Sequence, residues 1–319
     1  MPHIKYNSCH AVNYKLGVNL LDFKSRLDAL CCPYTENEPL SAHTTFKIGG
    51  PCDYFISPEG RDMLVSVLEL CREENVPYYV IGNGSNLLVS DLGVEGAVIH
   101  IGTGMSDISV DGENKIVCEA GARLSALCSF ALEQSMQGLQ FAWGIPGTVG
   151  GAIFMNAGAY GGEISGVIHD CTFINTDGEL STIGRDDMQL GYRTSLFRSA
   201  GGIITSARFS LPFGDRNQIR LEMDELLSRR RDKQPLEYPS AGSTFKRPPD
   251  NYAGTLIEQC GLKGLQIGGA AVSEKHAGFI INKGGCTASD VRRLIEEIQN
   301  RVFMETSVKL ESEIIFIGR

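Results

Sequence analysis

The chain has 319 residues, of which 42% are hydrophobic and 21% are charged, and its formal net charge is -9 at pH 7. This length allows two or three domains with a substantial core, and the composition is that of a globular protein rather than a disordered one. The negative charge disfavours nonspecific nucleic-acid binding, which needs a basic face that displaces counterions. No secretory signal pattern and no membrane-length apolar segment is present, so we expect a cytoplasmic location.

Ten cysteines are scattered along the chain. Only Cys31 and Cys32 lie close together in sequence, no CxxC spacing occurs, and no cysteine and histidine cluster has the spacing of a zinc site. We therefore expect no metal site and no disulfide framework, which is typical of a protein from a reducing compartment.

The pattern of apolar residues predicts a mixture of helices and strands after a loose arm at residues 1–20. Helices are predicted at 20–30, 62–75, 124–134, about 215–233, 255–259 and 289–306. Strands are predicted at 54–56, 78–81, 87–89, 97–101, 116–119, 166–175, 180–183, 202–211 and 314–317. An Asp-Gly pair at 177–178 lies between two of these strands and predicts a hairpin. These elements group into three α/β units, which favours an α+β architecture.

Two glycine-rich stretches stand out. Val80–Asp91 (VIGNGSNLLVSD) has a turn from Gly82 to Asn86 after an apolar strand, and Trp143–Gly161 contains a single amide side chain, Asn156, and no charge. Glycines let main-chain N–H groups approach a ligand closely, which suits a phosphate-bearing cofactor. Neither stretch is a Walker loop or a GxGxxG fingerprint, and either one alone is equally well interpreted as a tight turn. Together they favour a bound cofactor.

Polar residues interrupt apolar surroundings at several further places. Arg193 suits a carboxylate or phosphate, or is a surface cation. Ser243 has no GxSxG context and is interpreted by default as a turn serine, whereas Glu313 gains proton affinity if its apolar neighbours bury it. The basic run Arg229–Lys233 is interpreted as a solvated helix end, with anion binding as the alternative. For His276 we expect a packing or turn role.

Taken in order, these motifs resemble the UDP-N-acetylenolpyruvoylglucosamine reductase family. The resemblance covers most of the chain, from about His43 to Gly318, and the short interval between Arg193 and Ser243 resembles the type II branch. The segments that carry it are HTTFKIGG (43–50), GNGSNLLVSDLG (82–93), GIPGTVGGAIFMNAGAYG (144–161), YRTSLFR (192–198), SAGSTFKRPP (240–249), IGGAAVSEKHAGFIIN (267–282) and LESEIIFIG (310–318).

The resemblance implies an α+β fold with an FAD-binding fold of the vanillyl-alcohol-oxidase (PCMH) type in two subdomains and a carboxyl-terminal α/β substrate-binding domain. We expect an arm at 1–20, FAD-binding subdomains at 21–92 and 93–211, and the substrate-binding domain at 212–319.

The implied reaction uses FAD and NADPH to reduce UDP-N-acetylglucosamine enolpyruvate to UDP-N-acetylmuramate. This reaction belongs to peptidoglycan precursor synthesis, and through it to cell-wall biogenesis, cell shape and cell division. The UDP-sugar and NADPH are the implied partners, without nucleic acid, membrane or obligate protein partner. The alternatives are an FAD-dependent oxidase on the same scaffold and a noncatalytic flavin or nucleotide-sugar binder. The joint presence of Arg193, Ser243 and Glu313 argues against the noncatalytic binder.

By this resemblance Arg193 and Glu313 stabilise the negative charge that develops as hydride reaches the methylene carbon, and Ser243 protonates the neighbouring carbon. Lys246 is a candidate to stabilise the serine alkoxide. The implied cofactor-binding residues are Gly82, Asn83, Gly84, Ser85, Asn86, Leu87, Pro146, Gly147, Thr148, Gly150, Gly151 and Asn156. The implied substrate-binding residues are Tyr192, Lys233, Lys246 and Arg247. Four positions depart from the usual residues of the family, none of them catalytic: His43, Arg247, Ser312 and Ile315.

Overall fold

A computed structural model describes residues 20–319, so the expected arm at 1–20 lies outside the described residues except for its last position. The described chain divides into two compact units. Unit 1 contains the described residues up to Glu36, Tyr54–Asn83 and Gly96–Leu227, and unit 2 contains Asn37–Asp53, Gly84–Glu95 and Ser228–Arg319. Each unit is built from separated stretches of sequence, and the expected domain borders near residues 92 and 211 stay predictions.

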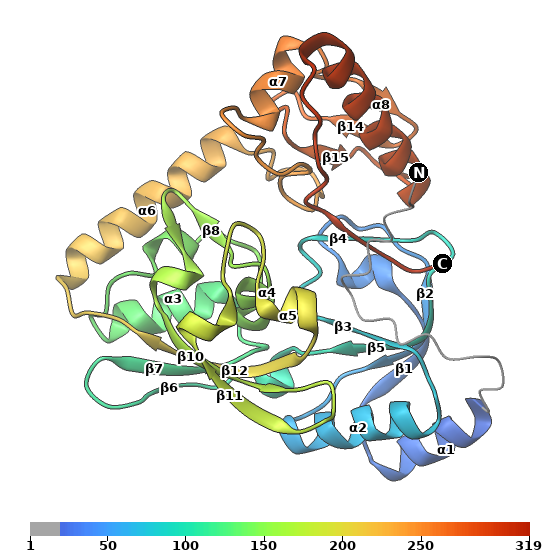
Figure 1. Cartoon of the computed structure of the whole chain (residues 1–319), viewed down its shortest axis with the longest axis vertical. Helices are drawn as coiled ribbons and strands as arrows, with labels where there is room; N and C mark the ends of the chain where they lie inside the picture. The colour runs from blue at the N-terminus through green and yellow to red at the C-terminus, as the bar shows by residue number, and fades with distance from the viewer. Residues whose placement is uncertain (1–19) are drawn as a thin grey trace. The chain divides into compact units, whose positions relative to one another are not determined.

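The helices lie close to where the apolar periodicity predicts them. Their bounds are α1 Leu20–Ala29, α2 Arg61–Glu73, α3 Leu124–Glu133, α4 Val149–Phe154, α5 Leu196–Ala200, α6 Arg216–Lys233, α7 Ala253–Gln259 and α8 Ala288–Thr306 (Figure 1). Short 3-10 helices occur at Leu40–His43, Thr103–Met105, Gln140–Ala142, Ile164–Gly166 and Arg185–Met188. The predicted helices are confirmed to within two residues at each end, whereas α4 and α5 were not predicted.

A five-stranded sheet in unit 1 has the order β11-β10-β12-β7-β6, and every neighbouring pair is antiparallel. Its strands are β6 Ile108–Val110, β7 Lys115–Glu119, β10 Ile168–Ile174, β11 Leu180–Gly184 and β12 Ile203–Ser210. The hairpin predicted from the Asp-Gly pair is confirmed, because β10 and β11 pair with Ile174 opposite Leu180. Gly178 has a φ of 89° in that turn, a conformation that glycine adopts without strain.

The remaining strands form smaller sheets. A four-stranded sheet has the order β1-β2-β5-β3, with β3 and β5 parallel. Unit 2 holds an antiparallel sheet β13-β14-β15 and the parallel pair β16 and β4, and the short pair β8 and β9 lies in unit 1. The bounds are β1 Tyr34–Pro39, β2 Pro51–Ile56, β3 Tyr78–Ile81, β4 Leu87–Val89, β5 Val94–His100, β8 Gly158–Ala159, β9 Gly162–Glu163, β13 Gln266–Ile267, β14 Ala270–Val272, β15 Ile280–Asn282 and β16 Ile315–Ile317.

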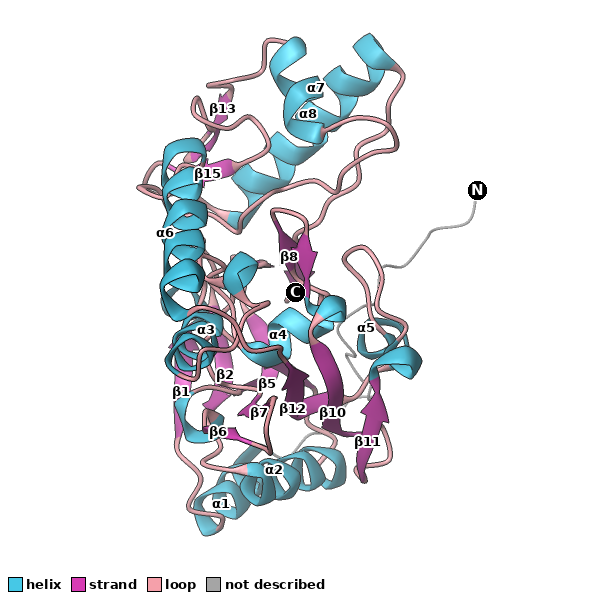
Figure 2. Ribbon diagram, turned by 90° about the vertical axis from the view of Figure 1, so that its left-hand side faces the viewer, coloured by secondary structure: helices cyan, strands magenta, loops and turns pink. Residues whose placement is uncertain are grey.

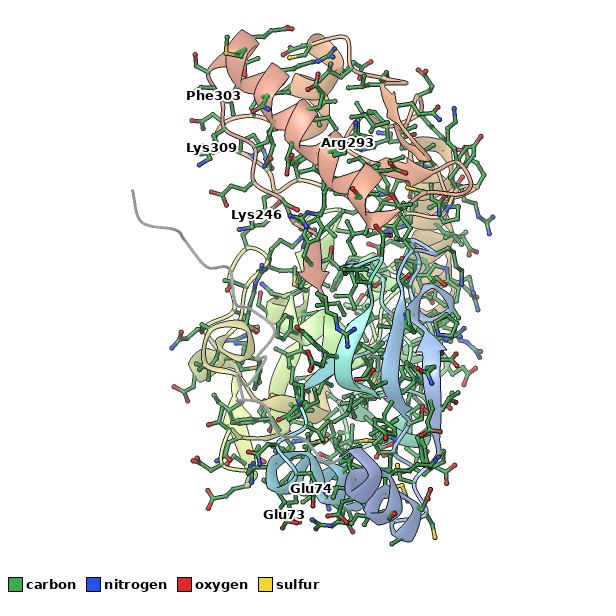
Figure 3. The ribbon with its side chains drawn as sticks, turned by 90° about the vertical axis from the view of Figure 1, so that its right-hand side faces the viewer. Glu73, Glu74, Lys246, Arg293, Phe303 and Lys309 are labelled. Atoms are coloured by element: carbon green, nitrogen blue, oxygen red, sulfur yellow. The ribbon has the colours of Figure 1, made fainter. Side chains whose placement is uncertain are left out.

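The core of unit 1 is formed by helices α1 to α4 together with strands of the five-stranded and four-stranded sheets. Helix α4 packs against β7 and β12, and α1 packs against α2, as Figure 2 also shows. Arg26 on α1 contacts both Glu73 and Glu74 at the end of α2, the two residues labelled at the foot of Figure 3. Burial of apolar side chains drives this packing, and the exposed ion pairs add little to it.

The core of unit 2 is organised around α8. This helix packs against α7 and against strands β13 and β14. Its buried side chains follow the three-to-four-residue spacing of one helix face, and they are Ala288, Val291, Leu294, Ile295, Ile298 and Val302. Thr287 and Asp290 form a capping box at its start, and the Asp91 carboxylate accepts hydrogen bonds from Ala288 N at 2.7 Å and Ser289 N at 3.0 Å.

No helix within residues 20–319 combines the length and the apolar character needed to cross a lipid bilayer. The described cysteines are all free, and the same part of the chain holds no group of acidic, histidine or cysteine side chains that could bind a metal ion.

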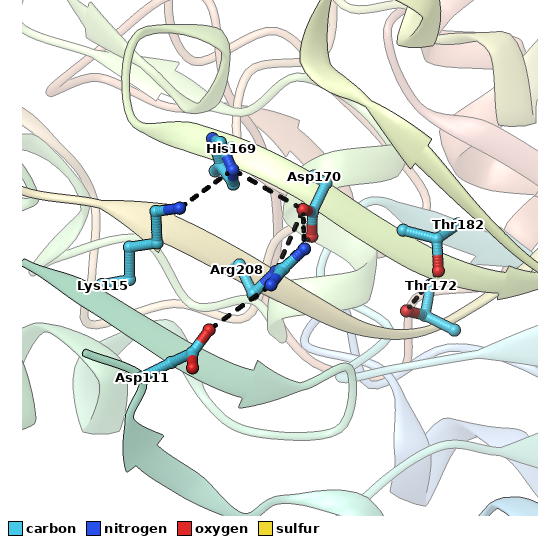
Figure 4. A network of polar contacts seen from close by, with 7 residues as sticks. All are labelled: Asp111, Lys115, His169, Asp170, Thr172, Thr182 and Arg208. Atoms are coloured by element: carbon cyan, nitrogen blue, oxygen red, sulfur yellow. Dashed lines mark hydrogen bonds and ion pairs between the residues drawn. The ribbon is translucent and has the colours of Figure 1, made fainter.

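A network of charged side chains lies on the five-stranded sheet (Figure 4). Asp170 on β10 is only 8% exposed, and both its oxygens accept from Arg208 Nε, at 2.9 and 3.0 Å. Arg208 Nη1 also lies 3.5 Å from Asp111 Oδ2, and His169 Nε2 lies 3.1 Å from Lys115 Nζ. A buried carboxylate of this kind needs its partner, because an unpaired charge at that depth is poorly solvated.

We expect Asp170→Ala to lower the free energy of unfolding by about 2 kcal/mol, because it removes charge-assisted hydrogen bonds from a partly buried guanidinium. Urea denaturation followed by circular dichroism measures this loss. Asp186→Ala is the matched control, since Asp186 is 89% exposed and also pairs with an arginine, Arg185. The control should change stability by less than about 0.5 kcal/mol. Equal losses of unfolding free energy in the two variants would show that the stabilising effect does not depend on burial of the Asp170–Arg208 pair.

Candidate active site

The two glycine-rich stretches meet within unit 1. Asn83 Nδ2 donates a hydrogen bond of 2.7 Å to the main-chain oxygen of Pro146. A Cβ atom placed on Gly82 would lie 2.2 Å from Thr148 Oγ1, so only glycine allows this close approach. In the sequence, each stretch alone is equally well interpreted as a tight turn, and only the two together favour a bound cofactor. The structure brings their unit 1 residues together.

The turn after β3 leaves main-chain donors unused. Within the described part of the chain, the N–H groups of Gly82 and Asn83 donate to no protein atom. Buried or half-buried main-chain N–H groups normally have an acceptor, and adjacent ones with no protein acceptor can bind an anion. The turn therefore fits a phosphate-bearing group such as FAD.

The second stretch is not a loop throughout, because residues Val149–Phe154 form helix α4. Thr148 caps this helix, and its Oγ1 accepts from Gly151 N at 3.4 Å. The N–H group of Gly150 is already engaged, since it donates to Ala120 O at 2.8 Å. Two glycines lower the intrinsic helix propensity, which is why the sequence predicted a loop here. The threonine cap and the packing of α4 on β7 and β12 stabilise the helix instead.

Arg193 lies on a tight turn that is anchored to the second stretch. Gly191 and Thr194 exchange main-chain hydrogen bonds of 3.1 and 3.2 Å across the turn. Arg193 has a φ of 54°, a left-handed conformation that is uncommon for a residue with a side chain. Asn156, which is 1% exposed, donates from Nδ2 to Gly191 O at 3.0 Å. Conformational strain of this kind occurs at functional sites when the surroundings hold it in place.

Side chains also hold the Arg193 guanidinium near the second stretch. Its Nη2 lies 3.4 Å from Gly158 O, and its Cζ lies 5.4 Å from the centre of the Tyr192 ring. Arg198 Nη1 donates to the main-chain oxygen of Arg193 at 2.7 Å. Both the guanidinium and the main chain of Arg193 are thus held by neighbouring residues. Tyr192, a predicted substrate residue, lies next to Arg193 and is 54% exposed.

In unit 2, Thr244 holds the segments of Ser243 and Glu313 side by side. Its main-chain oxygen accepts from Glu313 N at 2.8 Å, and its own N–H donates to Gly278 O at 2.9 Å. Ser243 is exposed, while Glu313 is only 9% exposed. The burial expected for Glu313 is confirmed, and two of the three predicted catalytic residues lie on neighbouring segments. That Arg193 joins them in one site stays a prediction.

Asn86 connects the unit 2 part of the first stretch to Glu313. Its Nδ2 donates to Glu313 O at 3.1 Å across 227 positions of sequence, and its main-chain oxygen accepts from Ile315 N at 2.9 Å. Leu87 then pairs with Ile315 as the strands β4 and β16 begin. The sequence placed Asn86 and Leu87 only in the cofactor loop, and nothing in it indicated this contact with the carboxyl terminus.

Protein partners are present for Lys246 and Arg247. Lys246 Nζ, labelled in Figure 3, lies 3.2 Å from Glu311 Oε2, and Arg247 Cζ lies 4.1 Å from the centre of the Tyr252 ring. Lys233 is the exposed last residue of α6. The atypical His43 contacts Glu38 through Nε2 at 2.8 Å. The roles predicted for Lys246, Arg247 and Lys233 toward the substrate stay predictions.

A cavity of about 380 Å³ opens in unit 1 among residues that the sequence did not indicate. Its lining residues are Glu59, Gly60, Arg61, Asp62, Met63, Met105, Glu119, Thr205 and Ser206. They come from the start of α2 and the two residues before it, from the 3-10 helix that ends at Met105, and from β7 and β12. None of the predicted site residues lines this cavity, so it supplies no evidence about their roles.

Two family models match the chain. Residues 52–184 match an FAD binding domain, and residues 234–317 match the carboxyl-terminal domain of UDP-N-acetylenolpyruvoylglucosamine reductase. The curated reductase of that name from Agathobacter rectalis is 49% identical over 294 residues, which cover 89% of this chain and 93% of the relative. The one from Clostridium perfringens is 46% identical over 285 residues, with coverages of 89% and 93%.

A solved structure agrees with these matches. The crystal structure of the UDP-N-acetylenolpyruvylglucosamine reductase from Thermus caldophilus aligns with a TM-score of 0.77 at 34% identity, and covers 89% of this chain and 98% of that one. An FAD-binding domain followed by a separate carboxyl-terminal domain defines a flavin-dependent oxidoreductase of α+β fold. The chain belongs to the UDP-N-acetylenolpyruvoylglucosamine reductase family. The predicted fold class, the FAD cofactor and the function as a reductase of peptidoglycan precursor synthesis are thereby confirmed at the level of the family.

Gly84→Ala should weaken flavin binding by about tenfold, because left-handed strain and a backbone collision together cost one or more kcal/mol. Gly84 has a φ of 59°, and an added Cβ would lie 2.2 Å from His43 O. Gly150→Val is expected to act in the same direction, since its Cβ would lie 3.0 Å from Ala120 Cβ. Titration of the flavin-free protein with FAD measures the affinity.

Gly112→Ala is the control, because Gly112 has a φ of 77° and nothing within 4 Å of the added atom. If this control lost as much flavin affinity, the collision would not be the cause.

Proposed function

We propose that this chain catalyses the NADPH-dependent reduction of UDP-N-acetylglucosamine enolpyruvate to UDP-N-acetylmuramate, as a type II member of its family. The observation that supports this most is family membership. The motif resemblance assigns Arg193, Ser243 and Glu313 to the catalytic positions of that family. The short interval between Arg193 and Ser243 supports the type II assignment. Bound FAD, once reduced by NADPH, supplies the hydride that adds to the methylene carbon of the enolpyruvyl group.

Residues of the two glycine-rich stretches would hold the cofactor. The N–H groups of Gly82 and Asn83, which donate to no protein atom within residues 20–319, suit the oxygens of a diphosphate. The bond from Asn83 to Pro146 and the contact of Gly82 with Thr148 keep the stretches together, so these donors need little rearrangement when the cofactor binds. Such preorganisation lowers the cost of binding.

Arg193 and Glu313 would stabilise the charge that develops on the carboxylate next to the reacting carbons. The main chain of the Arg193 turn is held by hydrogen bonds, Arg193 Nη2 lies 3.4 Å from Gly158 O, and the guanidinium carries a permanent positive charge. Glu313 is buried, and a carboxyl group that keeps its proton there can donate a hydrogen bond to an oxyanion. Donors that are positioned before the reaction act more strongly on the transition state than on the substrate.

Ser243 would complete the reaction as the proton donor. Its hydroxyl proton passes to the carbon next to the one that receives the hydride, so the carbon–carbon double bond becomes a single bond. The serine alkoxide then regains a proton from water, which the exposed position of Ser243 allows. A hydroxyl is a weak acid, but the carbon of an enolate is strongly basic, so the transfer is feasible.

Anaerobic stopped-flow absorbance tests this function against its alternatives. NADPH should bleach the visible flavin band of the purified protein, and the enolpyruvyl UDP-sugar should restore it much faster than air does. Fast return of the band with air and none with the UDP-sugar would identify an oxidase on the same scaffold. A band that NADPH never bleaches would identify a noncatalytic binder. The UDP-sugar and NADPH are thus the partners that we propose, and the cytoplasmic location stays a prediction.

A further inference from the structure

His276 lies on a turn that is paired with the segment of Ser243. The turn runs from Ser273 to Phe279, with Phe279 N donating to His276 O at 3.0 Å and Ser273 N donating to Phe279 O at 2.9 Å. Phe279 forms a β-bridge with Ser243, and Gly278 O accepts from Thr244 N at 2.9 Å. Any movement of Gly278 and Phe279 is therefore transmitted directly to the main chain that carries the Ser243 hydroxyl.

The imidazole of His276 contributes one of the bonds that hold this turn, together with the Ser273 hydroxyl, whose Oγ accepts from Lys275 N at 3.2 Å and from His276 N at 3.3 Å. Gly278 N donates a hydrogen bond of 3.1 Å to His276 Nδ1. A ring nitrogen accepts only when it carries no proton, so His276 is neutral, with its proton on Nε2. The ring packs edge-to-face on Phe279 with a centroid distance of 4.9 Å. The turn role expected for His276 from the sequence is confirmed.

The neighbours of the ring favour its neutral form. Burial lowers the pKa of His276 from the usual 6.5, and the nearby charge of Lys263 lowers it further, whereas its own main chain and Glu258 raise it. Lys263 and Glu258 pair with each other at 2.6 Å, which reduces the net effect of these two charges on the ring. The neighbouring charged residues on the turn, Glu274 and Lys275, are exposed.

We propose that His276 is a positioning residue for Ser243, whose neutral Nδ1 holds the Gly278 N–H and thereby aligns the main chain that pairs with the serine. The proposal rests on the proposed role of Ser243 as proton donor. Protonation of the ring would place one N–H group against another, so the bond to Gly278 would be lost and the turn would shift. The step that uses the serine proton should therefore slow as the pH falls below 6.5 and through the lowered pKa of His276.

Two variants separate the acceptor from the rest of the ring. His276→Leu removes the acceptor, whereas His276→Asn places a non-titrating amide oxygen close to the position of Nδ1. We expect His276→Leu to slow reoxidation of the reduced enzyme by the UDP-sugar about tenfold or more, because small misplacements of a reacting group have effects of that size. Reduction by NADPH should stay unchanged in both variants. His276→Asn should keep most of the reoxidation rate and lose its decline at low pH.

The background variant Ser243→Ala shows whether His276 acts through the serine. In the Ser243→Ala background, His276→Leu should slow reoxidation no further, because His276 is proposed to act only through the Ser243 hydroxyl and that background lacks it. Normal reoxidation by Ser243→Ala alone would refute the role of Ser243 as proton donor, on which the role of His276 rests, and would leave the reductase function standing. Slow reoxidation by Ser243→Ala combined with normal reoxidation by His276→Leu would overturn only the role of His276. A His276→Asn variant that reoxidises as slowly as His276→Leu would also overturn that role.

A readout independent of turnover comes from ¹⁵N NMR of the full-length enzyme labelled at histidine. At neutral pH we expect the His276 signal of a ring protonated at Nε2 only, with its titration midpoint below 6.5. A ring protonated at Nδ1 would overturn the proposal. Thermal denaturation would show whether His276→Leu folds. If it does not fold, the ¹⁵N spectrum and the pH dependence of reoxidation by His276→Asn still test the role of His276.

Discussion

Arg193→Ala should lower turnover by about 100-fold or more, because removing one preorganised donor from developing negative charge commonly has an effect of this size. The loss should fall on the half-reaction with the UDP-sugar, since the carboxylate that we propose Arg193 stabilises belongs to that substrate. Flavin reduction by NADPH should stay within about twofold of the unaltered enzyme, because that step develops no charge on this carboxylate. Stopped-flow measurement of both half-reactions checks this expectation.

Two further variants make the Arg193 result specific. Arg193→Lys keeps the positive charge but loses the planar fork, so its rate should lie between those of the alanine variant and the unaltered enzyme. Arg185→Ala is the surface control, because Arg185 is 53% exposed in the same unit and pairs with Asp186 at 3.2 Å. It should leave both half-reactions unchanged. A lysine variant as slow as the alanine variant would locate the effect in geometry rather than charge, and a slow Arg185→Ala would point to general destabilisation.

Ser243→Ala should slow reoxidation by the UDP-sugar by about 100-fold or more, because positioned proton donors contribute effects of that order. Flavin reduction by NADPH should remain nearly intact, since only the second half-reaction consumes the serine proton. Ser243 is exposed, so its substitution leaves no cavity in the core, and the main-chain pairing of its segment does not depend on the hydroxyl. Equal slowing of the two half-reactions would show that the assigned role is wrong.

Ser240→Ala is the matched control for this serine. It lies three positions earlier on the same segment, and its main-chain oxygen accepts from Thr45 Oγ1 at 2.7 Å, a bond that alanine preserves. Both half-reactions should therefore match those of the unaltered enzyme. If Ser240→Ala slowed reoxidation as much as Ser243→Ala, loss of order in the segment would explain both results.

Most regular elements were predicted from sequence because their signals are local. Strands β3 and β4 have the predicted bounds, and β2 and β5 begin three residues before their predicted starts. The apolar periodicity of α8 and the Asp-Gly turn between β10 and β11 depend only on neighbouring residues. Helix α4 was missed because its glycines reduce the helix signal, and tertiary packing outweighed that local preference.

The chemistry of the site was also predicted at the level of residue types. Arginine, serine and glutamate in the motifs that resemble the family indicated candidate catalytic side chains, and their roles stay predictions. Family membership rests on identity to curated relatives over most of the chain. The backbone conformation and the hydrogen bonds around these side chains were not predicted. The left-handed turn of Arg193 and its anchor to Asn156, together with the bond from Gly278 to His276, appear only in the folded chain.

The sequence by itself determined which groups are available, namely glycines for close approach, an arginine, a hydroxyl and a carboxyl group, and where helices and strands form around them. Only the tertiary structure decided which of these meet, as Asn83 meets Pro146 and Asn86 meets Glu313 across 63 and 227 positions. The reason is physical. Periodicity and turn propensity arise between near neighbours, whereas a hydrogen bond between distant segments depends on how the whole chain packs and leaves no pattern in the order of residues.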